Sequence, residues 1–359
     1  MKRIIKTLVL LLVFAVISIS AVGVWGYFTL QATLNQPLRI ELADTLDVPP
    51  GSTPARVFSG LQGAGVIERA EWVRRYWQWQ MPHAVLQVGE YRLEPGMDVN
   101  ALLGMLERGE VIQRSVTLVE GWSYSQFRRA LARAERLQQT LPQEWTDLQV
   151  AAELGLAEDH PEGLFFPDTY LYTLGMTDRD ILMRAHRRMQ QELVDAWEQR
   201  ADGLPINSAY EALILASIIE KETGVPRERG EIAGVFTRRL QIGMRLQTDP
   251  TVIYGMGDGY QGNIRRSDLR RPTPYNTYTI DGLPPTPIAM PGREALRAAV
   301  NPEPGKSLYF VARGDGSHVF SDTLQQHNRA VRNYQILNRA SNYRSSPPPA
   351  ENDANGVTQ

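Results

Sequence analysis

The pattern of apolar and polar positions along this 359-residue chain begins with one uninterrupted apolar block. No charged side chain occurs in residues 7–38. The apolar heart of the block, residues 8–30, is longer than the roughly 20 residues that cross a bilayer as a helix. Lys2, Arg3 and Lys6 precede the block, and basic residues beside an apolar span predict that this end stays in the cytoplasm. The pattern therefore predicts a membrane-spanning helix.

An uncleaved anchor fits this block better than a cleaved signal peptide does. The apolar region of a signal peptide covers only about 7–15 residues, and Ala21-Val22-Gly23 is a poor cleavage site. Trp25 and Tyr27 lie where an interfacial aromatic belt is expected. We expect a cytoplasmic segment at 1–6, a transmembrane anchor at 7–30, and the rest of the chain outside a bacterial inner membrane, most simply in the periplasm.

Short, mixed signals after the anchor predict a small α+β module over residues 38–114. Their order of strand, helix, helix and strand is compact and typical of a binding domain. The second helix is rich in tryptophan. Trp72, Trp77 and Trp79 are expected to pack in the core or between domains, with sugar stacking as the alternative. The expected elements are a strand near 46–48, a helix from Ser52 to Leu61, a helix at 70–80, a strand at 89–93, and a helix capped by Asp98 or Asn100 and closed by Gly109.

Longer amphipathic patterns predict a larger mixed α+β domain over residues 115–340. A turn-rich, aromatic connector is expected at 161–170. Residues 341–359 are polar and proline-rich, which predicts a disordered tail. The expected elements are a strand at 111–119, helices at 123–137, 148–156, 178–197, 229–242 and 293–300, a hairpin of strands at 308–312 and 318–320, and a last helix at 323–338.

Composition narrows the chemistry that this chain can perform. A net charge of −2 and the lack of any Lys/Arg-rich run give no reason to expect nucleic acid as a partner. The absence of cysteine excludes disulfides and thiolate chemistry. The five histidines show no metal-ligand spacing, so no cofactor is expected, although a metal site built from carboxylates stays open.

One apolar stretch, residues 212–219, leads directly into the charged group at 220–222. Eight residues with a single polar member favour a helix that is buried on all sides. Ser208, followed three residues later by Glu211, is a candidate capping box. A carboxylate at the end of a buried helix is costly unless it is paired, hydrogen-bonded or protonated, so we interpret Glu220 as a proton donor.

The two glutamates of this group, Glu220 and Glu222, point about 160° apart in an α-helix. They cannot act together as a two-carboxylate glycosidase pair, whose carboxyls lie roughly 5–9.5 Å apart across the substrate. Leu213 and Ala216, on the side of Glu220, favour a neutral acid there, but Glu222 has apolar neighbours as well. Geometry gives only a mild preference for Glu220. Both could instead form structural ion pairs with arginines such as Arg227, Arg238 or Arg239.

A proline-rich stretch, residues 271–292, contains six prolines and shows no clear periodicity. Long segments of this kind inside a compact domain are usually disordered or functional. The aromatic and asparagine content of this one favours an ordered, functional loop.

Four long motifs carry a family resemblance: residues 215–223 (LASIIEKET), 245–255 (RLQTDPTVIYG), 275–278 (YNTY) and 282–285 (GLPP). Shorter matches at 162–170, 288–292, 318–320 and 327–328 extend it over residues 38–340. This set closely resembles the YceG-like (MltG) family of membrane-anchored, endolytic murein transglycosylases of bacteria. The resemblance implies that the module at 38–114 is LysM-like and that Glu220 is the catalytic glutamate.

The resemblance also implies the reaction. A lytic transglycosylase cleaves the β-1,4 bond between N-acetylmuramic acid (MurNAc) and N-acetylglucosamine (GlcNAc) in nascent glycan strands, without water. One glutamic acid protonates the glycosidic oxygen and then deprotonates the muramic C6 hydroxyl, which closes on C1. The 1,6-anhydro end would terminate glycan elongation, in cooperation with peptidoglycan synthases. Because the nucleophile belongs to the substrate, one carboxyl is enough, which agrees with the helical geometry.

The 245–254 segment and the proline-rich stretch would then supply the glycan groove. For each candidate residue a packing role is an equal alternative, as is a turn or cap role for Asp249. Two other functions stay open: a muramidase in which Asp249 or Asp168 activates water, and a catalytically silent glycan-binding tether. The candidate sugar contacts are Gln247, Asp249, Tyr254, Tyr275, Asn276 and Tyr278.

Overall fold

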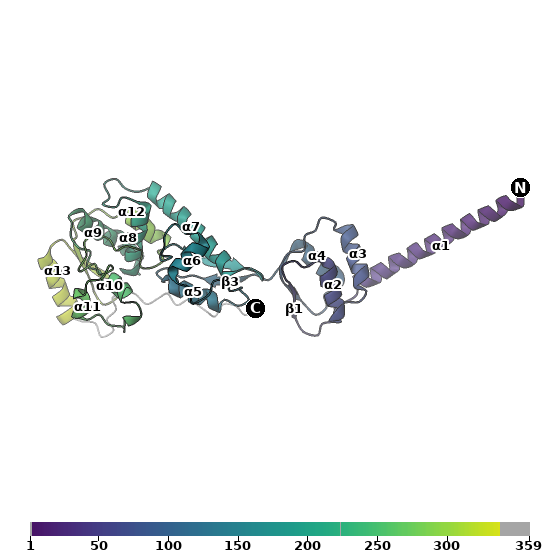
Figure 1. Cartoon of the computed structure of the whole chain (residues 1–359), viewed down its shortest axis with the longest axis horizontal. Coiled ribbons are helices and arrows are strands. Elements are labelled where there is room, and N and C mark those ends of the chain that lie inside the picture. Colours follow the sequence, from purple (N-terminus) through teal and green to yellow (C-terminus); the bar gives the residue numbers. More distant parts are fainter. Residues whose placement is uncertain (1, 223, 338–359) are drawn as a thin grey trace. The chain divides into compact units, whose positions relative to one another are not determined.

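The computed structural model describes residues 2–222 and 224–337, and it has the mixed α+β character expected from the sequence (Figure 1). Contacts within the chain divide it into two compact units. Unit 1 runs through Arg114 and also takes in Glu135–Gln138 and Leu171–Met176. Unit 2 contains the remaining segments.

Unit 1 begins with the long helix α1 (Lys2–Leu34), which projects from the small module that follows it (Figure 1). This helix is long and apolar enough to cross a membrane, and no residue of its most apolar stretch is buried. Its last turns change character, because Leu30 packs against the core of the module and Thr33 and Leu34 are buried in it. The expected anchor is therefore one end of a longer continuous helix.

The module of unit 1 pairs strand β1 (Asp44–Val48) antiparallel with β2 (Gly89–Leu93), so that Leu46 lies opposite Tyr91. Helices α2 (Pro54–Gly63) and α3 (Ala70–Gln80) lie between these strands in the sequence, and α4 (Val99–Arg108) follows. The predicted order of strand, helix, helix and strand is confirmed. Its core consists of apolar side chains from all of these elements, including Val48, Phe58, Trp77, Tyr91 and Leu103.

The N-cap residues of α2 and α4 can be compared with the predicted ones. Thr53, rather than the expected Ser52, caps α2: its Oγ1 accepts the Arg56 N–H at 3.3 Å. The cap falls there because Pro54 occupies the first helical position, where its fixed φ and missing N–H are favourable. At α4 the cap is Asp98, whose Oδ1 accepts the Ala101 N–H at 2.8 Å, and Asn100 lies inside the helix.

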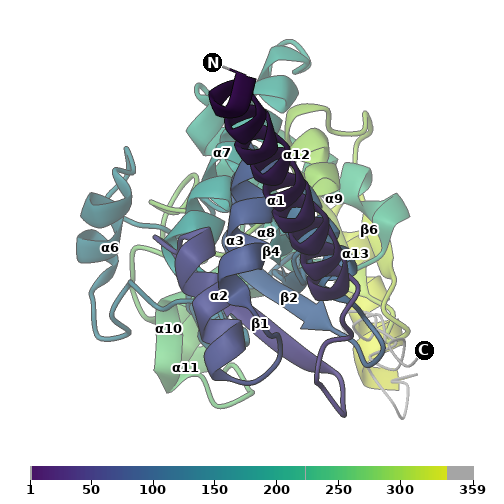
Figure 2. The same ribbon diagram turned by 90° about the vertical axis from the view of Figure 1, so that its right-hand side faces the viewer.

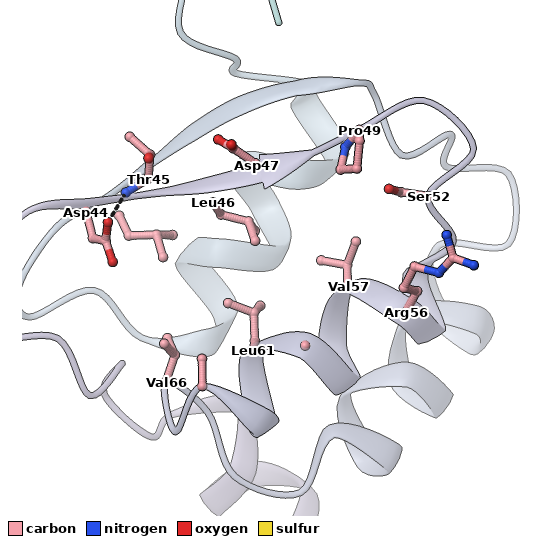
Figure 3. Close-up of a pocket in the computed structure, with 13 residues that line it drawn as sticks. Asp44, Thr45, Leu46, Asp47, Pro49, Ser52, Arg56, Val57, Leu61 and Val66 are labelled. Carbon is pink, nitrogen blue, oxygen red and sulfur yellow. Dashed lines mark hydrogen bonds between the residues drawn. The ribbon is translucent and has the colours of Figure 1, made fainter. Parts of the chain in front are cut away.

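A pocket of about 310 Å³ lies between β1 and α2 (Figure 3). Leu46 points from the strand toward Val57 and Leu61 of the helix, whereas the neighbouring Asp47 points away from them (Figure 3). The alternation follows from the strand period of two residues. The pocket wall is therefore mainly apolar.

A second two-stranded sheet joins β3 (Arg114–Thr117) to β4 (Thr169–Tyr172). The expectation of a connector through residue 170 is wrong at its end, because β4 begins at Thr169. Helix α5 (Tyr124–Arg133) is capped by Ser123, which forms a capping box with Gln126, but it ends before residue 137, since Ala134 is extended. Helices α6 (Asp147–Leu154) and α7 (Asp178–Glu198) lie where the pattern predicts them.

Helix α8 (Ala209–Glu222) lies in the core of unit 2, and every residue from Ala212 to Ile219 is buried. It packs against α7, α9 (Arg229–Gln241), α10 (Asp249–Met256) and α12 (Arg293–Val300). Ser208 caps it, since its Oγ accepts the Glu211 N–H at 3.1 Å, and the Glu211 carboxylate accepts the Asn207 N–H at 2.7 Å. The predicted buried central helix is confirmed.

The single polar residue among 212–219, Ser217, links this helix to another segment of the chain. Ser217 is fully buried, and its hydroxyl donates to the Ile214 carbonyl at 2.7 Å. The same oxygen accepts the Ile288 N–H at 3.0 Å. Ser217 therefore ties the central helix to the proline-rich stretch, which is ordered as expected but carries only isolated turns.

The remaining elements of unit 2 are short. The expected hairpin is confirmed: β5 (Tyr309–Ala312) pairs antiparallel with β6 (His318–Ser321). The last predicted helix is α13 (Leu324–Val331), continued by a π-helical segment at Arg332–Leu337. The expected disordered tail at 341–359 lies outside the described residues. Further short helices are η1 (Pro226–Glu228), η2 (Gly257–Gly259) and α11 (Arg266–Arg270).

Candidate active site

Glu220 lies in the last turn of α8, and its side chain is only 6% exposed. Its Oε1 accepts a hydrogen bond from Arg229 Nη2 at 3.1 Å, and its Oε2 accepts the Gly292 N–H at 3.0 Å. The helix that carries Glu220 has the expected apolar surroundings, but the Glu220 carboxyl itself meets polar groups. Both partners are donors, so each carboxyl oxygen of Glu220 accepts one hydrogen bond.

Three separate elements bring these groups together. Arg229 is the first residue of α9, directly after η1, and Gly292 is the N-cap of α12. Because the N-terminus of a helix carries a partial positive charge, the start of α12 also favours a carboxylate at this position. The buried ion pair that the sequence allowed is present, but its arginine is Arg229 and not one of the three expected candidates. Two of those candidates are engaged elsewhere, since Arg238 and Arg239 donate to the carbonyls of Ser307 and Leu308.

A second carboxyl, Glu120, lies on the exposed side of the same guanidinium. Its Oε2 is 3.9 Å from Arg229 Nη2, and its side chain is about half exposed at 51%. Partial burial and the charges of Glu220 and Glu294 raise the pKa of Glu120, while Arg229 opposes them. Two carboxyls that are remote in sequence therefore share one arginine, an arrangement that helical spacing could not reveal.

The backbone next to Glu120 explains how it reaches this place. The Gly121 N–H donates to the Met290 carbonyl, and the Met290 N–H donates to the Trp122 carbonyl, both at 2.8 Å. Gly121 adopts a φ of 73°, a left-handed conformation that favours glycine, and a methyl group there would lie 3.7 Å from Glu220 Cγ. The signal in the sequence was the Glu-Gly pair directly after the predicted strand at 111–119.

Glu222 has different surroundings from Glu220. Its carboxylate accepts the Thr248 hydroxyl, and Thr248 in turn bonds to Thr277 through its N–H at 3.0 Å. Burial raises the pKa of Glu222 to about 7, with Asp249 adding to the shift and Thr248 and Arg239 opposing it. The predicted divergence of the two glutamates is confirmed, because each faces its own set of partners.

The six candidate sugar contacts fall into different environments. Tyr254 and Tyr275 are half-buried and meet edge to face with ring centroids 4.9 Å apart. The Tyr278 hydroxyl donates to Asp249 Oδ1 at 2.7 Å, at the start of α10. Gln247 is exposed and has a φ of 48°. Asn276 is different, because it is 1% exposed and its amide donates to three carbonyls of its own loop, those of Asp268, Leu269 and Arg271.

Glu162 is a further buried acid beside this tyrosine pair, and it is 3% exposed. Its Oε1 accepts the Tyr124 N–H at 2.9 Å, and its carboxyl also accepts the Tyr254 hydroxyl. Burial raises the pKa of Glu162 to about 8, although both hydrogen bonds and Lys221 lower it. In the sequence Glu162 stands out only as part of a short motif, since nothing local shows that its side chain turns inward.

The chain combines a helix long and apolar enough to cross a membrane with a buried, arginine-paired glutamate at the end of a core helix. The model of the YceG-like family matches residues 46–333, and the chain belongs to that family. An endolytic murein transglycosylase of Bacillus subtilis (strain 168) is 30% identical over 327 residues, which cover 86% of this chain and 90% of that protein.

Two further proteins are similar to this chain. An endolytic murein transglycosylase of Streptococcus pneumoniae (strain D39) is 26% identical over 85% of this chain and 62% of its own length. A crystal structure of a putative YceG-like protein from Listeria monocytogenes is 27% identical, with a TM-score of 0.49 over 80% of this chain and 98% of that chain.

Proposed function

We propose that this protein is an endolytic murein transglycosylase that cleaves the MurNAc–GlcNAc bond of nascent glycan strands and leaves 1,6-anhydro-MurNAc ends. The observation that carries the proposal is the buried Glu220, held by Arg229 and the Gly292 N–H. Membership in the YceG-like family and relatives named endolytic murein transglycosylases support it.

In the proposed reaction Glu220 acts first as a general acid. It gives its proton to the glycosidic oxygen, and the bond from that oxygen to C1 of MurNAc breaks. The carboxylate then takes the proton of the C6 hydroxyl as its oxygen bonds to C1. No water enters, and the net proton transfer runs from the C6 hydroxyl to the leaving oxygen. Arg229 and the Gly292 N–H donate hydrogen bonds to the carboxylate before it acts as the base.

Glu120 has a supporting part in this proposal. Positive charge develops on C1 and the ring oxygen as the glycosidic bond breaks, and a nearby carboxylate stabilises it. Glu120 is half exposed and shares Arg229 with the acid, so it is suited to face the bound sugar. It is also a better candidate than Asp249 for a water-activating base in a hydrolase, because Asp249 is bonded to Tyr278.

The groove and the accessory module complete the proposal. Tyr254, Tyr275, Tyr278, Gln247 and Asp249 are proposed to contact the glycan. Asn276 shapes the loop from within, since its amide is fully used by the backbone.

The module at 38–114 is proposed to be LysM-like, which the order β1-α2-α3-β2 supports. The domain at 115–340 would carry out catalysis in the periplasm, with the chain held in the inner membrane at 7–30 and residues 1–6 in the cytoplasm. The proposed outcome is termination of glycan elongation beside peptidoglycan synthases.

Product analysis tests the proposal. The full chain in detergent is incubated with peptidoglycan, and the fragments are analysed by mass spectrometry for 1,6-anhydro-MurNAc ends. Wild type and the matched control Glu222→Gln should form them, whereas Glu220→Gln should not. Reducing MurNAc ends would instead identify a muramidase. Binding without cleavage by wild type would identify a tether and overturn the proposal.

A further inference from the structure

The three tryptophans of α3 lie in three different environments. Trp77 is 3% exposed in the module core, edge to face with Phe58 at 5.9 Å. Trp72 is half-buried and meets Trp25 of α1 edge to face at 6.0 Å. Trp79 is 75% exposed. Residues seven apart share a helix face, so Trp72 and Trp79 lie on one side of α3, away from Trp77.

The height of this aromatic face relative to a bilayer follows from α1. The exposed apolar side chains of α1 continue as far as Phe28, and packing against the module begins at Leu30. From Thr7 to Phe28 the helix is about 33 Å long at 1.5 Å per residue, which matches the roughly 30 Å of a hydrocarbon core. The far surface of the bilayer therefore falls beside residues 25–28.

Trp72 contacts α1 at that level. A methyl group on Gly26 would lie 3.9 Å from the Trp72 ring, directly next to the Trp25 contact. Figure 1 shows α3 standing across α1 where α1 leaves the module, and Figure 2 shows the two helices side by side. The face of α3 that carries Trp72 and Trp79 therefore begins at the level of the bilayer surface.

We propose that the face of α3 formed by Trp72, Arg75, Tyr76 and Trp79 rests in the headgroup region of the lipid bilayer that α1 crosses. The side chains suit this partner. Trp and Tyr place an apolar ring and a polar tip at the interface, and the long arginine side chain reaches toward headgroup oxygens. Arg75 is 67% exposed, and its guanidinium pairs with the exposed Glu71 on its own helix.

This contact gives the module a second attachment to the membrane. A single helix lets the module rotate and tilt about its exit point, whereas a docked α3 fixes one face of the module toward the lipid. Interfacial binding of this kind grows with the apolar area that enters the headgroup region. The inference rests on α1 spanning a bilayer and does not depend on the proposed catalytic reaction.

The chain has no cysteine, so a single introduced cysteine can report on one position. Trp79→Cys and, as a matched control, Gln78→Cys are made in the full chain. Both sites are exposed, and they lie about 100° apart around α3. Each variant carries a nitroxide label and is reconstituted in nanodiscs of phosphatidylethanolamine and phosphatidylglycerol. Collisions of the label with oxygen report lipid, and collisions with a water-soluble nickel chelate report solvent.

The label at 79 should show a several-fold higher ratio of oxygen to nickel collisions than the label at 78. Equal ratios at the two sites would overturn the proposal. Added soluble glycan that shields position 79 in detergent, with no shielding by lipid, would overturn it in favour of sugar stacking.

A second measurement retains the native side chains. Lipids brominated near the headgroup should quench the fluorescence of wild type more than that of Trp79→Phe. If the quenched fraction is the same in both proteins, Trp79 does not touch lipid.

Discussion

Glu162 is a carboxyl whose proton should couple the stability of unit 2 to pH. Its pKa is about 8 in the folded chain, because burial outweighs the hydrogen bonds from the Tyr124 N–H and the Tyr254 hydroxyl. The ordinary value for glutamate is about 4.3. Folding therefore binds a proton at any pH between these two values. The free energy of unfolding is highest below the unfolded pKa and falls as the pH rises through this window.

The size of the effect follows from the width of that window. Within it the loss of stability is about 1.4 kcal/mol per pH unit, or about 3 kcal/mol between pH 5.5 and 7.5. Glu222, with a pKa of about 7, adds a loss of the same sign. A domain of 150–250 residues shifts its Tm by roughly 2–4 °C per kcal/mol, so the part due to Glu162 corresponds to roughly 6–12 °C.

The variant Glu162→Gln removes the contribution of Glu162 to the pH dependence of Tm. Glutamine has the same shape, its Oε1 can still accept the Tyr124 N–H, and it does not titrate. Scanning calorimetry of the full chain in detergent should show that the Tm of unit 2 falls by roughly 6–12 °C more in wild type than in the variant from pH 5.5 to 7.5. Glu144→Gln, at an exposed position, should follow wild type. Parallel curves for wild type and Glu162→Gln would refute the assigned protonation.

Four further substitutions test the site and its supports. Glu220→Gln should lower the rate of anhydro-end formation by about 10²- to 10⁴-fold, the usual contribution of a general acid–base, and mass spectrometry with Glu222→Gln as control measures it. Arg229→Met leaves a buried carboxylate without its charged partner and should cost about 3 kcal/mol in calorimetry, whereas the exposed Arg227→Met should cost almost nothing. In Gly292→Ala the new methyl group would lie 2.0 Å from Glu120 Oε1, so Glu120 must move. Turnover should then fall about 10- to 100-fold at nearly unchanged Tm, and an unchanged turnover would remove Glu120 from the mechanism. Ser217→Ala leaves the buried Ile288 N–H without its acceptor and should lower the free energy of unfolding by about 1–3 kcal/mol in chemical denaturation. An unchanged free energy would contradict the role of Ser217 in linking α8 to the proline-rich stretch.

The elements that local chemistry controls agree most closely with expectation. The helices at Ala70–Gln80 and Arg293–Val300 and the strand at Gly89–Leu93 have the predicted bounds. Apolar periodicity and nearby start and stop residues are sufficient to specify such elements. β4 was missed because its support is not local: Thr169 bonds to Thr117 of β3, which is 52 residues earlier. A short strand with a remote partner carries little signal of its own.

The chain by itself determined that a carboxylate stands at the end of a buried helix and that its neighbour two residues on must face elsewhere. Both statements depend only on composition and on the period of the helix. What holds Glu220 was decided by tertiary structure, because its partners lie 9 and 72 residues later, and the backbone beside Glu120 meets Lys221 across 100 residues. A buried carboxyl takes its chemistry from the charges and donors that packing brings within a few ångströms, and sequence spacing does not encode those distances.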